Sequence, residues 1–206
     1  MYSKKLYGSQ FLLLRRERST QETWWSLEQI AGRLVEISGM GATAPLTLAF
    51  GLVLEAQRHG EPVVWITRDN SLFYPPDVAE GGIDFDAMVI VRVPDSRAAA
   101  RAADQLVRSG AFGLIVLDLG ANINVPTPIQ TRLAGLAHKH QTALLCLTAK
   151  GDEAPSLGPL VSLRVAARRE RLADGRFSCG LTVLKDKRRG PTWRYAEVCH
   201  GPDGLR

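Results

Sequence analysis

The chain has 206 residues, of which 45% are hydrophobic and 23% are charged, with a net charge of +5. This composition supports a sizeable core, argues against a disordered chain and favours one domain. The three cysteines show no CxxC spacing, which argues against a disulfide framework or a zinc site and suits a reducing cytoplasm. No apolar run approaches the roughly 20 residues of a membrane-spanning helix, so we expect no membrane partner.

Strand and helix patterns alternate from the first apolar strand to Lys150. Buried strands are predicted at residues 33–38, 62–69, 87–94, 112–120 and 142–150. Helices are predicted between them at residues 43–58, 96–109 and 128–140, with Asp95 as the N-cap of the second. Such alternation is typical of βαβ units and predicts a mainly parallel sheet flanked by helices.

The pattern changes after Lys150. Three strands are predicted in succession, at residues 160–172, 176–188 and 192–200, and Asp174-Gly175 is a hairpin signal between the first two. The sheet is therefore expected to end in an antiparallel extension. The same strands carry most of the surplus positive charge, which indicates either a surface for nucleic acid or an acidic partner, or a plain solvated face.

The order of these elements resembles the core of the RecA-type recombinase ATPases. "GRLVEISG" (residues 32–39) is similar to the strand entering that family's phosphate loop, and "VVWITRDNSLFYP" to the strand carrying its catalytic glutamate. "RSGAFGLIVLDL" is similar to its metal-side strand, and "LTVLKDKRRGP" to a strand whose lysines reach the nucleotide of a neighbouring subunit. The resemblance implies the α/β fold of a RecA-like P-loop NTPase core, with a twisted sheet.

The phosphate loop departs from the family's pattern at three chemical positions. A working loop, GxxxxGK[ST], needs backbone N–H groups, a lysine ammonium and a hydroxyl that binds magnesium. Counted from Gly39, the second glycine is replaced by Ala44, the lysine by Pro45 and the hydroxyl residue by Leu46. Proline is nevertheless well suited to the first turn of a helix. The stretch therefore predicts a retained turn without ATP chemistry, and hence a pseudo-ATPase with no cofactor, no metal and no catalytic residue.

Four further residues occupy positions that the resemblance marks. Asp118 matches the magnesium-linked aspartate, and Asp69 stands where the catalytic glutamate would be. We interpret both as remnants of a degenerate nucleotide site. Lys185 and Lys187 keep the pattern of the lysines that act across the subunit interface. Without a phosphate opposite them, these lysines favour a role toward DNA or an acidic partner.

Other candidate contact residues are basic or aromatic. Arg188 and Arg189 extend the basic stretch, and charge reversal there should weaken any binding of single-stranded DNA. The adjacent Trp24 and Trp25 allow either packing on the domain or anchoring of a partner. "GDEAPSLG" (residues 151–158) is short where the recombinases carry a long DNA-binding loop, which argues against a self-assembled recombination filament.

Within the RecA-like superfamily, the chain is most similar to the ImuA branch, whose members are also described as SulA-like. That resemblance implies a bacterial, cytoplasmic accessory protein of SOS mutagenesis and translesion DNA synthesis. Its implied partners are RecA, an ImuB-type Y-family polymerase homologue and, indirectly, an error-prone replicative-type polymerase. The basic strands add single-stranded DNA as a candidate ligand. Three alternatives stay open: a SulA-type inhibitor of cell division, an ATPase with an unorthodox loop, and a DNA-binding module that uses the basic C-terminal strands.

The expected organisation has three parts. Residues 1–31 form an N-terminal segment that could bind a partner, residues 32–199 form the RecA-like core, and residues 200–206 form a tail.

Overall fold

A computed structural model describes residues 25–41, 44–69, 81–121, 123, 125–172 and 176–199. The described helices and strands follow one another in this order: α1 (Leu27–Ile30), β1 (Leu34–Ser38), α2 (Pro45–Arg58), β2 (Val63–Arg68), β3 (Met88–Val93), α4 (Ser96–Ser109), β4 (Leu114–Gly120), α5 (Thr127–His140), β5 (Ala143–Thr148), β6 (Leu163–Arg171), β7 (Phe177–Asp186) and β8 (Arg194–Cys199). The predicted strands and helices are confirmed, with small shifts of their ends. The short helix α1 was not predicted, because four residues are too few to show a helical period.

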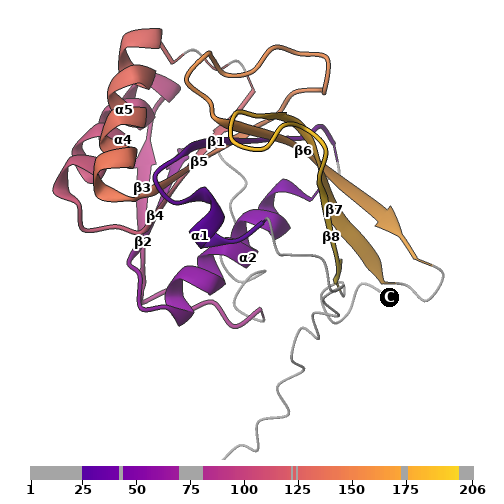
Figure 1. Cartoon of the computed structure of the whole chain (residues 1–206). Coiled ribbons are helices and arrows are strands. Elements are labelled where there is room, and N and C mark those ends of the chain that lie inside the picture. The colour runs from indigo at the N-terminus through magenta and orange to yellow at the C-terminus, as the bar shows by residue number, and fades with distance from the viewer. Residues whose placement is uncertain are drawn as a thin grey trace, which may run out of the picture.

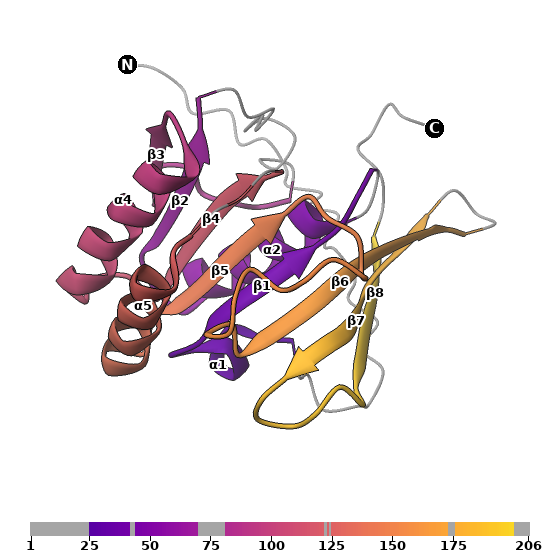
Figure 2. The same ribbon diagram turned by 90° about the horizontal axis from the view of Figure 1, so that it is seen from above.

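Eight strands form one sheet in the order β3-β2-β4-β5-β1-β6-β7-β8 (Figures 1 and 2). The strands from β3 to β6 pair in parallel, whereas β7 and β8 are antiparallel to their neighbours. The predicted α/β class, parallel sheet and antiparallel extension are therefore all confirmed. One detail was not foreseen: β6 joins β1 in parallel, so the antiparallel part begins only with β7.

Helices cover both faces of the sheet. Figures 1 and 2 show α4 and α5 on one face, and α1 and α2 on the other. Each face has its own apolar cluster, one that includes Leu48, Leu52 and Trp65, and one that includes Val107, Ile115 and Leu133. The inner strands are buried on both faces, which explains their nearly continuous apolar sequences.

The helix ends follow local sequence signals. Asp95 caps α4, since its carboxylate accepts a hydrogen bond of 2.7 Å from the Ala98 N–H. Gly110 ends the same helix with φ +68°, a conformation that costs glycine little. Pro45 occupies the first position of α2, where its missing N–H leaves no helical hydrogen bond unmade.

Some predictions fall on residues that the structure does not describe. These are residues 1–24 of the N-terminal segment with the partner-binding role of Trp24, the Asp174-Gly175 turn and the tail at residues 200–206. The strands on either side of that turn do pair, and the Leu172 N–H donates to the Arg176 carbonyl over 2.8 Å. None of the helices in the described ranges is long and apolar enough to cross a membrane.

Candidate functional site

The turn between β1 and α2 lies at the carboxyl edge of the parallel strands. The Gly39 N–H donates to the Thr148 carbonyl over 3.1 Å, which fixes the start of the turn beside β5. Ala44 is buried at the N-cap of α2 and offers no side-chain hydrogen bond. Leu46, in contrast, is 45% exposed, and Met40 is 65% exposed. Hydrocarbon therefore faces solvent where a phosphate loop would present a hydroxyl group.

The two acidic candidates lie at the same edge but on other strands. The Thr67 hydroxyl donates to Asp118 Oδ2 over 3.1 Å, and the two residues are partners in the register of β2 and β4. Asp69 is exposed just after β2, with its N–H bonded to the Val93 carbonyl. Because β5 separates β4 from β1, neither carboxylate comes from a strand next to the Gly39 turn. Among the described residues, no group of three or more His, Cys, Asp or Glu side chains is placed to hold a metal ion.

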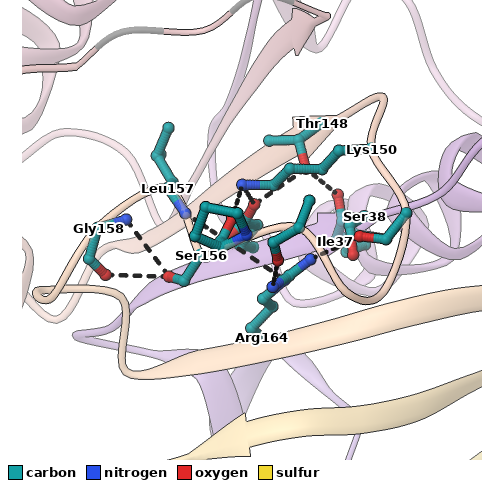
Figure 3. Close-up of polar contacts among 12 residues, drawn as sticks. Ile37, Ser38, Thr148, Lys150, Ser156, Leu157, Gly158 and Arg164 are labelled. Carbon is teal, nitrogen blue, oxygen red and sulfur yellow. Dashed lines mark hydrogen bonds and ion pairs between the residues drawn. The ribbon is translucent and has the colours of Figure 1, made fainter.

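A charged cluster that the sequence reasoning missed lies under this edge. Glu36 is fully buried in β1, and its carboxylate accepts hydrogen bonds from the Thr148 hydroxyl at 3.0 Å and the Leu157 N–H at 2.8 Å. Lys150 Nζ lies 2.6 Å from Oε1, and Arg164 Nε lies 3.9 Å from Oε2. Figure 3 shows Thr148, Lys150, Leu157 and Arg164 converging on this place. A glutamate inside the apolar strand "LVEIS" was the available signal.

The cluster holds the segment between β5 and β6, residues 151–161, which we call the strap. Arg164 donates to the Gly151 and Ala154 carbonyls, Lys150 to the Pro155 carbonyl, and Lys187 to the Pro159 carbonyl. The strap is thus tied by three cations to β6, β7 and the end of β5. A short, bound strap stands where the resemblance would place a long DNA-binding loop.

The strap is also packed against α5. The Gln130 amide donates to the carbonyls of Val125 and Leu157, over 2.7 and 3.1 Å. Its side chain fills the space in front of Gly158, where an added Cβ would collide with the amide group. Only glycine fits there without a shift of Gln130 or of the strap.

The basic candidates lie at the other end of the sheet. Lys185 is next to Arg164 in the register of β7 and β6, and the turn after β7 carries Lys187, Arg188 and Arg189. Burial, together with Lys187 and Arg164, lowers the pKa of Lys185, while Glu36 opposes the shift. Lys187 is bound to the strap and Arg189 to the Gln29 side chain. The structure therefore does not bring these four residues together with the Gly39 turn.

A family model places this chain among known proteins. The model describes the RecA N-terminal domain, and it matches residues 28–149. That match covers more than half of the chain. The chain belongs to the RecA N-terminal domain family.

Curated relatives agree with the family model over a shorter stretch. The chain is 40% identical over 88 residues to Protein RecA of Nocardioides sp., which covers 42% of this chain and 25% of that protein. It is 39% identical over 88 residues to Protein RecA of Fusobacterium nucleatum, covering 42% and 23%. It is 34% identical over 100 residues to Protein RecA of Corynebacterium pseudotuberculosis, covering 48% and 27%. The matched stretch thus spans about a quarter of each relative.

In this RecA-family chain, the family match ends within the link after β5. The Gly39 turn, Asp69, Asp118, Glu36 and Thr148 lie inside the matched residues. The strap, Arg164 and the strands β6 to β8 lie outside them. The basic candidates therefore depend on the resemblance of "LTVLKDKRRGP" and stay a prediction.

Trp25 packs in the core. It is only 4% exposed and belongs to the cluster that contains Leu27 and Ile30. Of the two alternatives for this ring, the structure shows packing on the domain. The side chain is therefore not available as a surface anchor in this conformation.

A second feature that the sequence reasoning left unresolved is the shape of the basic strands. The last partner of β6 on β1 is Ala166, so residues 167–171 continue past the carboxyl end of β1. Together with the start of β7 they form a basic arm, defined here as residues 167–171 and 176–177. Arg169 and Arg171 are exposed on it, and Arg169 lies over the Phe177 ring at 3.8 Å. The arm thus carries exposed positive charge past the carboxyl end of β1, at the opposite end of the sheet from the turn after β7.

Proposed function

We propose that this chain is a non-catalytic RecA-like accessory protein of bacterial error-prone translesion DNA synthesis. In this role it binds RecA, an ImuB-type polymerase homologue, or both. One observation carries the proposal. A RecA-type fold is kept through β1, α2 and the parallel strands, while its phosphate loop presents Pro45 and exposed Leu46.

The chemistry of that turn supports a pseudo-ATPase. Phosphate loops act through N–H groups, an ammonium and a hydroxyl bound to magnesium. Pro45 supplies neither an ammonium nor an N–H, and Leu46 has no metal ligand. Asp118 is hydrogen-bonded by Thr67 and faces no lysine from the turn. The retained fold then serves recognition, since it can present surfaces that resemble those of a RecA subunit.

A RecA-like fold without a working phosphate loop suggests how the protein would act on a RecA filament. One of its faces resembles a subunit and would dock at a filament end. Because the Gly39 turn would hold no ATP at the interface with the next subunit, growth of the filament would stop there. The protein would therefore shorten RecA filaments or lower their activity.

RecA-catalysed strand exchange with rising amounts of the full chain tests this mechanism. We expect exchange and mean filament length in electron micrographs to fall as the chain approaches the concentration of filament ends. A pull-down from DNA-damaged cells should recover RecA or the polymerase homologue. Unchanged exchange and filament length, together with no binding to RecA or to the polymerase homologue, would refute the proposal, and capture of the division GTPase instead would favour the SulA-type role.

Nucleotide binding separates the accessory protein from an ATPase. Isothermal titration of the chain with ATP and magnesium should give no binding heat and no released phosphate. Measurable turnover would reassign the protein to the enzymes.

The basic arm favours a second function, binding of single-stranded DNA. Arg169 and Arg171 are exposed on the part of β6 that extends past the carboxyl end of β1, where their charges are open to phosphate groups. Binding through them should weaken steeply as salt is raised. Reversal of Arg169 and Arg171 to glutamate should lower affinity more than reversal of Arg188 and Arg189, because the Arg189 side chain is bound to Gln29. Equal losses of affinity in the two double variants would show that the basic arm is not the DNA-binding surface.

A further inference from the structure

Two of the three cysteines meet at the edge of the sheet. Cys199 of β8 lies opposite Phe177 of β7, and Cys179 lies opposite Glu197. Because alternate residues of a strand share a face, the two cysteines are diagonal neighbours on the same face. Their side chains are joined by a hydrogen bond. Both residues belong to the same buried cluster, and neither forms a disulfide.

The surroundings of this pair differ from those of the third cysteine. Cys179 and Cys199 form a small apolar cluster with Ala44, against which Phe177 packs. Cys146 lies apart from them in the centre of β5, and burial raises the pKa of its thiol. The hydrogen bond from Cys199 has the opposite effect and lowers the pKa of the Cys179 thiol. A thiol with a lowered pKa reacts faster with oxidants, because the thiolate is the nucleophile.

We propose that Cys179 and Cys199 form a redox modification site, at which a hydroperoxide converts the two thiols into a disulfide between β7 and β8. The Cys179 thiolate attacks the terminal peroxide oxygen, the O–O bond breaks, and the leaving hydroxide or alkoxide takes a proton to become water or an alcohol, respectively. Cys179 is then a sulfenic acid. The Cys199 sulfur attacks it, the S–S bond forms, and the hydroxyl group leaves with the Cys199 proton as water. Two electrons pass from the two sulfurs to the peroxide.

The burial of the pair selects the reagent. Cys179 is 3% exposed and Cys199 is 8% exposed, so a small oxidant can reach sulfur more easily than a bulky disulfide. The resulting disulfide joins the edge strand β8 to β7 beside Ala44, the N-cap residue of α2. The site therefore lies against Ala44 at the start of α2 and against Phe177 at the base of the basic arm. This inference does not depend on the proposed accessory function.

Mass spectrometry of the full chain tests the site. The reduced protein is treated with hydrogen peroxide, unfolded, and alkylated with N-ethylmaleimide. We expect the number of alkylated cysteines to fall from three to one, with Cys146 as the labelled residue and one peptide pair linked through Cys179 and Cys199. The same oxidation in urea is the control, and the native fold should favour this pair over links to Cys146 by at least about ten-fold.

Single variants separate the two roles. Cys199→Ser should stop the reaction at the Cys179 sulfenic acid, which dimedone traps, whereas Cys179→Ser should give no dimedone adduct. Cys146→Ala should form the disulfide as the natural chain does. Three alkylated cysteines after peroxide treatment of the folded natural chain would overturn the proposal. So would a disulfide that links Cys146 as readily as Cys179 and Cys199.

Discussion

Arg33 and Asp186, which are 153 positions apart in the chain, form an ion pair of 2.6 Å in which both side chains are buried. Arg33 precedes β1 and Asp186 ends β7, so the pair ties the parallel part of the sheet to its antiparallel extension. The Trp193 indole and the Arg188 N–H donate to the same carboxylate, over 3.0 and 2.9 Å. The buried Asp186 carboxylate thus accepts hydrogen bonds from Arg33, Arg188 and Trp193.

Removal of this acid should destabilise the fold strongly. Asp186→Ala leaves the buried Arg33 guanidinium without a countercharge, although its hydrogen bonds to Ser162 remain, and should lower the free energy of unfolding by about 3–5 kcal/mol. Urea denaturation measures the change. The double variant Arg33→Met, Asp186→Leu is the matched control and should regain most of the loss. Equal losses in the single and double variants would contradict the explanation by an unpaired charge.

The same carboxylate predicts a pH dependence. Burial acts to raise the pKa of Asp186, but the hydrogen bonds from Arg188, Trp193 and Arg33 outweigh it and hold the pKa below its ordinary value. A depressed pKa adds stability above the unfolded value, near pH 4, and this stability is lost as pH falls through the folded pKa. Urea midpoints measured from pH 6 to pH 2 should therefore fall more steeply in the natural chain than in Asp186→Asn. Parallel curves for the two proteins would argue against the shift.

Glu36→Gln should release the strap. The change keeps the shape of the side chain but leaves Lys150 and Arg164 without a countercharge, at a cost of about 2–4 kcal/mol in unfolding free energy. Hydrogen exchange at the Leu157 amide, which donates to Glu36, should speed up by more than the change in global stability requires. Thr148→Val is the comparison, since it removes one hydrogen bond to the Glu36 carboxylate but keeps both ion pairs, and should cost about 1.5 kcal/mol. An unchanged exchange rate of the Leu157 amide in Glu36→Gln would show that the Glu36 carboxylate does not hold the strap in place.

Gly158→Ala should destabilise the contact between the strap and α5. The new methyl group meets the Gln130 amide, and such overpacking costs about 1–3 kcal/mol. A double-mutant cycle with Gln130→Ala measures the coupling, which should be favourable by about 1 kcal/mol or more because the shortened side chain makes room. Additive losses would show that the two residues do not compete for space.

Pro45→Lys should not create an ATPase. The new ammonium would still face Ala44 in place of a glycine and Leu46 in place of a hydroxyl residue, so magnesium would lack its protein ligand. Phosphate release measured with the variant should equal that of the natural chain. The triple change Ala44→Gly, Pro45→Lys, Leu46→Thr is the comparison that restores all three parts. Turnover by Pro45→Lys alone would mean that the other two positions do not matter.

Much of the architecture follows from patterns that the chain shows locally. The apolar strands, the Asp95 cap and Pro45 at a helix start each depend on neighbours within a few residues. The sequence therefore predicts the elements and the loss of the phosphate loop's chemistry. The parallel pairing of β6 with β1 depends on contacts between residues far apart in the chain, and periodicity contains no information about it.

The charged cluster around Glu36 could not be predicted from the sequence for the same reason. Glu36 stands out in "LVEIS", but its partners come from β5, the strap and β6. These partners lie more than a hundred positions away from Glu36 in the chain, so no local pattern connects them to it. Trp25 poses a similar problem, because an adjacent tryptophan pair is equally compatible with packing and with exposure until the neighbouring surface is known.

The three cations that bind the strap, Lys150, Arg164 and Lys187, also set its length. Each bond to a carbonyl group of the strap fixes a different position along it, and the Leu157 N–H completes the shell of Glu36. An inserted residue would shift these carbonyls out of register and leave charge in the interior uncompensated. The link between β5 and β6 therefore tolerates substitution at exposed side chains far better than insertion or deletion, and a peptide tag placed there should abolish folding.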